Sequence, residues 1–271
     1  MPDNRNLSTN HEDWFLFHFS SVKVLRPDEL VAALMGQGVL RSTESGSWER
    51  LEKGLPSEAH INRLHVHEQA LYACTNHGLY SLQGNDEWKE TRLAIGCYQY
   101  RQLGNLALAA TQYGLWSSVG GHWTKTAYAS SIVYDFLYLP QFIILAMDHG
   151  LALYDRLTDA WQEYDWGVAV TSLAIYHGHV LAVTEKGQLM MGNKRGGFDS
   201  IRFGKQFIFS VVSKAGGVFL CTDRGLYRMS VLRAGQPTLI SVKLGCPVTD
   251  IDMDGDNLYM ATLFQGVQTM T

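Results

Sequence analysis

LYACTNHGLYSL, residues 71–82, contains a short apolar strand, a polar turn, a glycine and a second apolar strand. Residues 106–118, LALAATQYGLWSS, repeat these features in the same order. Five further copies complete the set: VAALMGQGVLRS (31–42), FIILAMDHGLALYD (142–155), VLAVTEKGQLMMG (180–192), VFLCTDRGLYRMS (218–230) and LYMATLFQGVQTM (258–270). Seven copies along one chain indicate a repeat architecture.

One glycine marks the same position in every copy. These marker glycines are Gly38, Gly78, Gly114, Gly150, Gly187, Gly225 and Gly266, and neighbouring ones lie 36 to 41 residues apart. A glycine here supplies the positive φ that a tight hairpin demands. One strand precedes each hairpin, and a strand with a bulky aromatic residue follows most of them: Trp48, Trp88, Trp123, Trp161 and Phe198. Four strands in roughly 38 residues make one propeller blade.

The sequence therefore predicts an all-β fold, a seven-bladed β-propeller of four-stranded blades. The last copy ends at Thr271 with no aromatic-bearing fourth strand after it. Residues 13–19, DWFLFHF, offer such a strand, so we expect the N-terminal strand around Trp14 to complete the C-terminal blade. Closure removes exposed sheet edges, whereas an open solenoid needs polar caps at both ends. We expect residues 1–271 to form a single propeller domain, with 1–11 as a flexible or peripheral segment.

Charge and hydropathy restrict the classes of partner. The formal net charge is −4, and Lys and Arg residues are scattered. Without a basic stripe we expect no binding to nucleic acid. No apolar run reaches the roughly 20 residues of a membrane span, so we expect no membrane partner. Residues 1–13 do not resemble a secretion signal, and the default expectation is a cytoplasmic location.

The four cysteines are Cys74, Cys97, Cys221 and Cys246. They are widely separated and contain no CxxC pair, so they resemble neither a disulfide framework nor a zinc site. Cys74 and Cys221 occupy the same small apolar position of two repeats, where other copies have Ala or Val. We expect all four to be structural.

LYACTNHGLYSL with Trp88, and LALAATQYGLWSS with Trp123, resemble the repeats of bacterial-neuraminidase-like (BNR/Asp-box) and two-component-regulator propellers. Residues 42–48, STESGSW, are similar to an Asp-box, although this version is one residue short and has Glu44 in place of Asp. The resemblance covers nearly the whole chain. It implies a propeller, but no single activity, because that superfamily includes glycosidases, assembly factors, lectins and sensor domains.

Sialidase chemistry in that superfamily uses three arginines for the substrate carboxylate, a tyrosine nucleophile with a glutamate, and an acidic aspartate. Arg63 and Arg101 lie near first-strand positions. A convincing third arginine and a motif-anchored Tyr–Glu pair are missing. We therefore do not expect sialidase activity.

The polar turns before the marker glycines share one face of a propeller with the loops that join fourth strands to first strands. We call this surface the turn face. Its turn residues are Asn76, His77, Gln112, Tyr113, Asp148, His149, Glu185, Lys186, Asp223, Arg224, Phe264 and Gln265. The candidate binding residues among them are His77, Tyr113, Asp148, His149, Asp223 and Arg224. The alternative is that they are polar only because exposed turns are hydrated.

Polar residues also occupy the starts of the innermost strands: Asn62, Arg63, Gln99, Arg101, Asp135, Ser172, Ser210 and Asp250. Converging polar groups at the mouth of a closed ring are typical of a small-molecule site. We select Arg63, Arg101, Asp135 and Asp250 as candidates for binding a small polar ligand. The alternative is a water-filled channel whose polar walls are satisfied by one another.

Two motifs suggest metal binding, and neither is complete. His65 and His67 would share one face of a strand, but propeller oxygenases of the carotenoid-cleaving kind draw four histidines from different innermost strands. Residues 252–257, DMDGDN, resemble a calcium loop without its downstream acid and suit an ordinary hairpin turn. We expect no metal and no cofactor.

No P-loop, GxSxG elbow or HExxH motif is present in the sequence. The predicted function is a non-catalytic binding scaffold that docks a protein partner. One alternative is a propeller enzyme, a lyase or hydrolase, with a polar active site in the central funnel. A second alternative is carbohydrate binding, suggested by Tyr113, Trp116 and other aromatic residues near the turns.

Overall fold

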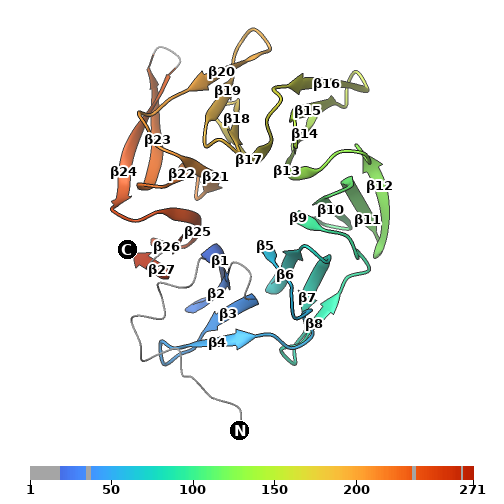
Figure 1. Ribbon diagram of the computed structural model, residues 1–271, viewed down its shortest axis with the longest axis vertical. Coiled ribbons are helices and arrows are strands. Elements are labelled where there is room, and N and C mark those ends of the chain that lie inside the picture. The colour runs from blue at the N-terminus through green and yellow to red at the C-terminus, as the bar shows by residue number, and fades with distance from the viewer. Residues whose placement is uncertain (1–18, 35–37, 234–235, 264) are drawn as a thin grey trace.

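The computed structural model describes residues 19–271, apart from 35–37, 234–235 and 264. Within these ranges the chain forms 27 β-strands and no helix. The strands form seven antiparallel sheets, which stand around a central axis as the blades of a propeller (Figure 1). The predicted all-β, seven-bladed propeller is confirmed.

The first four blades follow one another along the chain. Blade 1 contains β1 (Phe19–Arg26), β2 (Glu29–Leu34), β3 (Gly38–Ser42) and β4 (Trp48–Leu51). Blade 2 contains β5 (Ile61–His67), β6 (Ala70–Thr75), β7 (Leu79–Leu82) and β8 (Trp88–Glu90). Blade 3 contains β9 (Cys97–Leu103), β10 (Leu106–Thr111), β11 (Gly114–Val119) and β12 (His122–Ala127). Blade 4 contains β13 (Val133–Tyr138), β14 (Phe142–Met147), β15 (Gly150–Asp155) and β16 (Ala160–Asp165).

The remaining three blades complete the ring. Blade 5 contains β17 (Val170–Tyr176), β18 (His179–Thr184), β19 (Leu189–Gly192) and β20 (Phe198–Ile201). Blade 6 contains β21 (Ile208–Lys214), β22 (Gly217–Thr222), β23 (Gly225–Arg233) and β24 (Gln236–Leu244). Blade 7 contains β25 (Val248–Asp254), β26 (Asn257–Thr262) and β27 (Val267–Met270).

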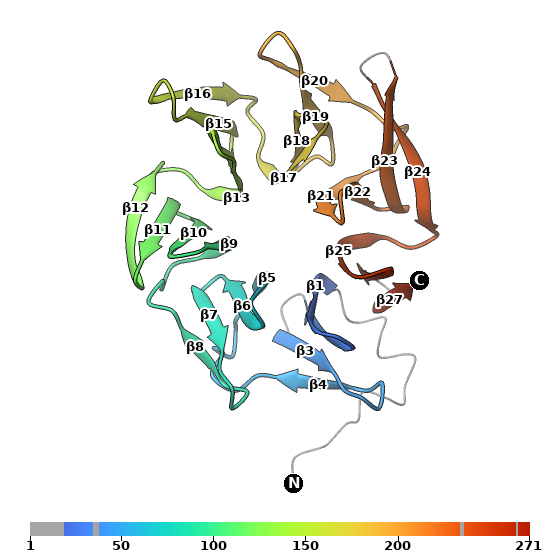
Figure 2. The ribbon, with the colours of Figure 1, turned by 180° about the vertical axis from the view of Figure 1, so that it is seen from behind.

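In each blade the first strand is innermost, and the others follow outward in chain order. Blade 7 lies beside blade 1 in both views, so the two ends of the described chain meet (Figure 2). The predicted closing strand around Trp14 and the predicted flexible segment 1–11 lie outside the described residues.

The marker glycines have a second role besides the turn. Gly150 has a φ of +152°, and a Cβ atom at this position would lie 1.9 Å from the carbonyl oxygen of Tyr164. A Cβ atom at Gly225 would lie 2.0 Å from the carbonyl oxygen of Lys243. Tyr164 and Lys243 belong to the outermost strands, so glycine here also permits the third and fourth strands to approach closely.

Aromatic residues of the outer strands join neighbouring blades. Trp88 is only 2% exposed, and its Nε1 donates a hydrogen bond of 2.9 Å to the carbonyl oxygen of Leu51 in blade 1. Trp123 makes the equivalent bond of 3.0 Å to Thr91. Trp161 differs, because it is 39% exposed and contacts the rings of Tyr128 and Tyr154.

The four cysteines are free thiols and all are buried. Burial raises the pKa of the Cys221 thiol to about 12, so this sulfur is a thiol and not a nucleophilic thiolate at neutral pH. The acidic motif 252–257 spans the end of β25, a turn at Gly255 and Asp256, and the start of β26. It therefore forms a hairpin turn.

Candidate functional site

A β-bulge near the start of each innermost strand determines which residues face the axis. In blade 2 the register shifts between Ile61 and Arg63, and in blade 4 it shifts between Val133 and Asp135. The other five innermost strands shift at the equivalent position. A bulge re-aims the side chain that follows it. The seven residues directly after the bulge form the first ring: Ser21, Arg63, Gln99, Asp135, Ser172, Ser210 and Asp250.

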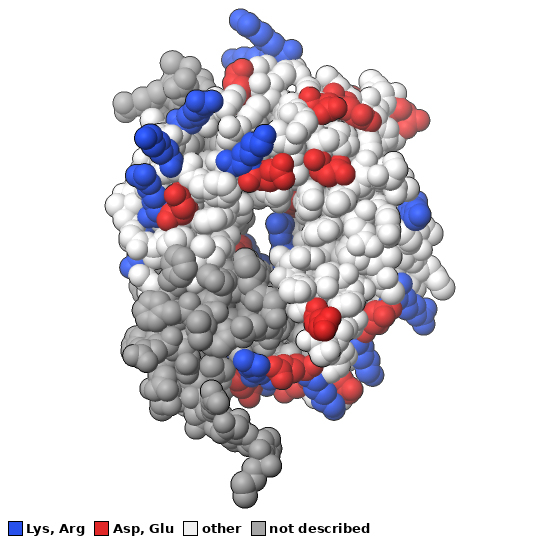
Figure 3. Space-filling view, in the orientation of Figure 1, with Lys and Arg blue, Asp and Glu red and all other residues white. Residues whose placement is uncertain are grey.

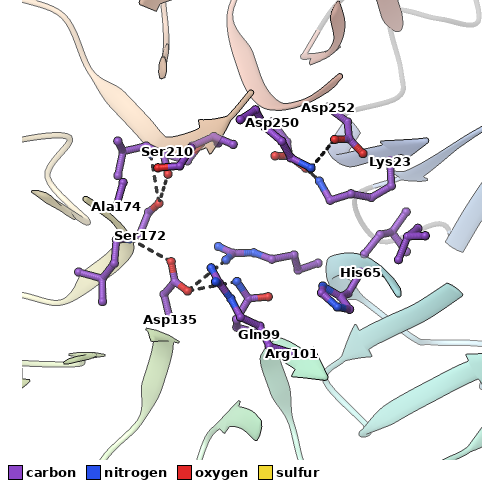
Figure 4. A pocket seen from close by; sticks show the side chains of 18 of the residues that line it. Lys23, His65, Gln99, Arg101, Asp135, Ser172, Ala174, Ser210, Asp250 and Asp252 are labelled. Carbon is purple, nitrogen blue, oxygen red and sulfur yellow. Dashed lines mark hydrogen bonds and ion pairs between the residues drawn. The ribbon is translucent and has the colours of Figure 1, made fainter. Parts of the chain in front are cut away.

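A second ring lies two residues further along each innermost strand. Its members are Lys23, His65, Arg101, Leu137, Ala174, Val212 and Asp252. All seven line a central channel of about 1110 Å³, together with every first-ring residue except the buried Ser21. The channel opens on the face shown in Figure 3, where Lys or Arg atoms are visible within the opening. Figure 4 shows labelled side chains from both rings arranged around this common space.

First-ring side chains join adjacent blades. At four junctions such a side chain accepts a hydrogen bond from a backbone N–H of the next blade. The donor is the residue directly after the first-ring residue of that blade. The pairs are Ser21 with Leu64 (3.3 Å), Asp135 with Leu173 (2.9 Å), Ser172 with Val211 (3.1 Å) and Asp250 with Val22 (3.1 Å). These backbone groups would otherwise be unsatisfied beside the channel. Part of the polar wall therefore has a structural purpose.

Three cations of the channel wall have carboxylate partners. Lys23 lies 2.5 Å from Asp250, and Lys214 of β21 lies 2.5 Å from Asp252. Burial alone would raise the pKa of Asp250, but Lys23 and the hydroxyl of Ser21 outweigh it, so the pKa is lowered and the group is ionised.

The third pair crosses the channel wall between blades 2 and 4. Arg63 lies 3.4 Å from Asp135, whose side chain is almost completely buried. Burial acts to lower the pKa of Arg63, but the carboxylates of Asp135 and Asp250 raise it above its usual value. The Arg63 guanidinium is therefore charged and already neutralised by its own protein.

Arg101 and His65 have a different environment. The guanidinium of Arg101 lies 5.9 Å from the centroid of the Phe136 ring, and no ion pair to it is found within the described part of the chain. The Nε2 atom of His65 is buried and has no hydrogen-bond partner, and the ring packs against Tyr100 at 5.4 Å. Burial, followed by the positive charges of Arg101 and Lys23, lowers the pKa of His65 to about 4.

On the turn face, the first residue of the turn is bonded to the loop that precedes the blade in four of the blades. Its side chain accepts a hydrogen bond from the backbone N–H sixteen residues earlier in four blades. The pairs are Asn76 with His60 (2.8 Å), Asp148 with Ile132 (3.4 Å), Glu185 with Ala169 (3.4 Å) and Asp223 with Phe207 (2.9 Å). Asp148 and Asp223, both candidate binding residues, therefore also hold the loops in place.

The second residue of each turn projects outward. His77, Tyr113, Lys186, Arg224 and Gln265 are exposed, and Phe264 lies outside the described residues. His149 is partly exposed, with Nδ1 only 2.6 Å from the Asp148 carboxylate. The structure thus places His77, Tyr113, His149 and Arg224 at one equivalent position of four blades.

The channel candidates Arg63, Arg101, Asp135 and Asp250 all line the channel. Sequence reasoning missed Lys23, Lys214 and Asp252 as channel residues. The sequence did contain a signal for Lys23 and Asp252. Residues two apart on a strand face the same way, and each of these two lies two residues after a first-ring residue.

A smaller groove of about 560 Å³ lies between blades 2 and 3. Its walls include Tyr72, Tyr100 and Trp123, and the rings of Tyr72 and Tyr100 are 4.6 Å apart. Tyr113 and Trp116, the aromatic residues that suggested carbohydrate binding, do not line it.

Two kinds of site are not assembled in residues 19–271, leaving aside 35–37, 234–235 and 264. No group of three or more His, Cys, Asp or Glu side chains there could hold a metal ion. Arg63 and Arg101 are the two arginines of the channel lining, so the channel lining does not contain the arginine triad of a sialidase. None of the described residues belongs to a helix long and apolar enough to cross a membrane.

No protein-family model matches this chain, and no curated protein matches its sequence. Solved structures do match its fold. A structure described as the extracellular domain of a one-component system, BT4673 from B. thetaiotaomicron, has a TM-score of 0.74 at 15% identity, over 94% of this chain and 38% of its own. The extracellular domain of a hybrid two-component system, BT3049 from the same organism, has a TM-score of 0.73 at 14% identity, over 93% and 39%. The chain thus spans about two fifths of the length of these neighbours.

A third match is the WD40 β-propeller domain of Doa1, with a TM-score of 0.67 at 10% identity over 93% of this chain and 92% of that one. The resemblance to two-component-regulator propellers is confirmed at the level of the fold. The expected cytoplasmic location is contradicted, because the regulator neighbours are described as extracellular domains.

Proposed function

We propose that this propeller is a non-catalytic binding module that docks a protein partner on its turn face. The observation that carries the proposal is the fixed geometry of the turns in blades 2, 4, 5 and 6, where the first turn residue bonds to the backbone and the second is at least partly exposed. The first residue holds the loop, as Asp223 does for Phe207, while the second residue, as at Arg224, projects from a rigid base. A fixed ring of exposed side chains that differ from blade to blade suits recognition of a shaped surface.

The turn face of blades 5 and 6 favours an acidic partner surface. Lys186, Arg202, Lys205 and Arg224 are exposed there, and the acidic side chains of Glu185 and Asp223 are bonded to backbone amides. Phe207 adds exposed apolar surface, at 39%. Figure 3 shows Lys and Arg side chains gathered over β20, β23 and β24, and Asp and Glu over β15 and β16. Complementary charge of this kind steers association and orients the partner.

The channel supports a binding role over the enzymatic alternative. Each of its second- and first-ring carboxylates, Asp135, Asp250 and Asp252, is engaged in at least three hydrogen bonds or ion pairs. A general base needs an accessible lone pair directed at its substrate. Both oxygens of Asp135 and both oxygens of Asp252 are occupied in this way, and Oδ2 of Asp250 accepts from three donors. The structural neighbours that are extracellular domains support an extracellular or periplasmic location for the module.

Site-specific photo-crosslinking in cells that express the chain naturally tests the docking surface. A photoreactive residue is placed at His77, Lys186 or Arg224, and at Lys125 on the rim as a control. We expect one protein to be captured at two or more turn-face positions and not at Lys125. Capture at Lys125 alone, or none at the turn face, would contradict the proposal.

The captured protein is then purified and its affinity for charge-reversed variants is measured. We expect Arg224→Glu to weaken binding roughly tenfold, because a complementary charge becomes a repulsive one. Arg50→Glu, at an exposed position of β4, is the matched control and should bind as the unmodified chain does. Equal binding by both variants would show that the basic part of the turn face is not the docking surface.

A further inference from the structure

The second ring of the channel is divided by chemistry. Three consecutive blades, 1 to 3, contribute the polar side chains Lys23, His65 and Arg101. The next three blades contribute Leu137, Ala174 and Val212. All six residues border the same channel, although Leu137 and Ala174 are packed in the hydrophobic core and are only 7% and 1% exposed. A water-filled passage needs no such division, whereas an amphipathic ligand would match it.

Among the described residues, Arg101 is the cation of this ring without a carboxylate partner. Lys23 is paired with Asp250, and the ring's own carboxylate, Asp252, is occupied by Lys214. The guanidinium of Arg101 lies 5.9 Å from the centroid of the Phe136 ring. A guanidinium held against an aromatic face keeps its outward donors free for a planar acid group.

Three cations, Arg101, Lys23 and Lys214, act on His65 on this side of the channel, and Lys23 and Lys214 are each paired with a carboxylate. After burial, the charge of Arg101 is the largest influence that lowers the pKa of His65. An anion placed here would therefore lie in a favourable field. Arg101 is also next to the apolar wall, because β9 and β13 are the innermost strands of adjacent blades.

We propose that the second ring binds a small amphipathic carboxylate, with the acid group on Arg101 and the apolar part on Val212 and the exposed edge of Leu137. The site is independent of the turn-face docking surface. Its volume of about 1110 Å³ accommodates a small organic acid with several waters, and ligand sites of roughly 300–1,000 Å³ are common in proteins. One free arginine selects one acid group, which distinguishes this site from an arginine triad.

Isothermal titration calorimetry with three probes tests the assignment: hexanoate, its neutral analogue hexanamide, and inorganic phosphate. We expect hexanoate to bind and the other two to bind at least tenfold more weakly. Hexanamide lacks the charge that Arg101 recognises, and phosphate lacks the apolar part. No binding of hexanoate at millimolar concentration would overturn the proposal, as would equal binding of hexanamide or of phosphate.

Arg101→Gln and Arg50→Gln form a matched pair of variants. Loss of a charged hydrogen bond predicts roughly ten- to hundredfold weaker hexanoate binding for Arg101→Gln. Arg50, exposed on β4 and paired with Glu52, should be replaceable without effect. Thermal unfolding of each variant shows whether it is folded. Unchanged hexanoate affinity in folded Arg101→Gln would overturn the site.

Two further readouts do not depend on the folding of Arg101→Gln. Val212→Thr preserves shape but adds a hydroxyl to the apolar wall, so hexanoate should bind several-fold more weakly. In the unmodified chain, the ring NMR signals of His65 should shift when hexanoate is added at pH 7, because the bound anion changes the electrostatic field at the ring. If neither changes, the ligand does not lie in the second ring.

Discussion

Oδ2 of Asp250 lies 2.8 Å from the hydroxyl oxygen of Ser21, although 229 residues separate them in the chain. The same oxygen accepts hydrogen bonds from the backbone N–H of Val22 and from Nζ of Lys23. Asp252 extends the contact by accepting from the N–H of Val24. Two carboxylates on β25 therefore hold β1 in place, where the first described blade meets the last.

Replacing Asp250 should weaken this junction. Asp250→Ala leaves Lys23 without its partner and the N–H of Val22 unbonded, which should lower the free energy of unfolding by about 3 kcal/mol. Asp254→Ala, at an exposed position of the same strand, is the control and should change stability little. Urea unfolding followed by tryptophan fluorescence gives both values. Equal stability of the two variants would show that ring closure does not depend on Asp250.

Stability should fall on mild acidification because of His65. Its pKa is about 4 in the folded chain and near 6.5 when unfolded, so only the unfolded state takes up this proton between pH 6.5 and 4. Protonation therefore favours unfolding throughout that window. Thermal midpoints at pH 7.5 and 5 measure the effect. His65→Gln should reduce the difference by about 2–4 °C, and His122→Gln, exposed on β12, should not. An identical difference in both variants would contradict this explanation.

The tryptophans of the outer strands should differ in their contribution to stability. Trp88→Phe removes a buried hydrogen bond to Leu51 and leaves a cavity, so we expect a loss of about 2 kcal/mol. Trp161→Phe makes the same chemical change at a side chain that is 39% exposed, and about 0.5 kcal/mol is expected. Chemical unfolding compares them. A larger loss for Trp161→Phe would show that the blades are not joined through Trp88.

Close approach of strands should make Gly150 irreplaceable by alanine. A Cβ there would overlap the carbonyl oxygen of Tyr164, so β15 and β16 would have to separate. We expect a loss of about 2–3 kcal/mol. Gly104→Ala also places alanine at a positive φ, of +61°, but nothing lies within 4 Å of its Cβ. We expect a smaller loss of stability for Gly104→Ala, which measures the φ strain alone. Equal losses for the two variants would show that crowding at Gly150 is unimportant.

Sequence reasoning could locate the channel residues because the repeat aligns them. Arg63, Asp135 and Asp250 occupy one position of three blades, so their place near the axis follows once the blades are recognised. Which of them are paired does not follow. Arg63 and Asp135 come from blades 2 and 4, and no spacing in the chain indicates that these two side chains lie 3.4 Å apart.

The turn face shows the same limit. The sequence indicates that Asp223 and Arg224 share a turn, and treats both as equivalent candidates for binding. The structure separates them, because Asp223 accepts a hydrogen bond from Phe207 while Arg224 is exposed. Phe207 precedes β21 and Asp223 follows β22, so the difference exists only after these two strands have paired in blade 6.

The sequence alone determined the all-β class, the number of blades and part of the set of residues that line the axis. These properties follow from local periodicity: strands alternate, turns need glycine, and one unit recurs seven times. Only the tertiary structure decided which charges are neutralised and that Arg101 is left without a carboxylate among the described residues. Ion pairing depends on distances between side chains of different blades, and those distances are set by the closed ring rather than by the order of residues.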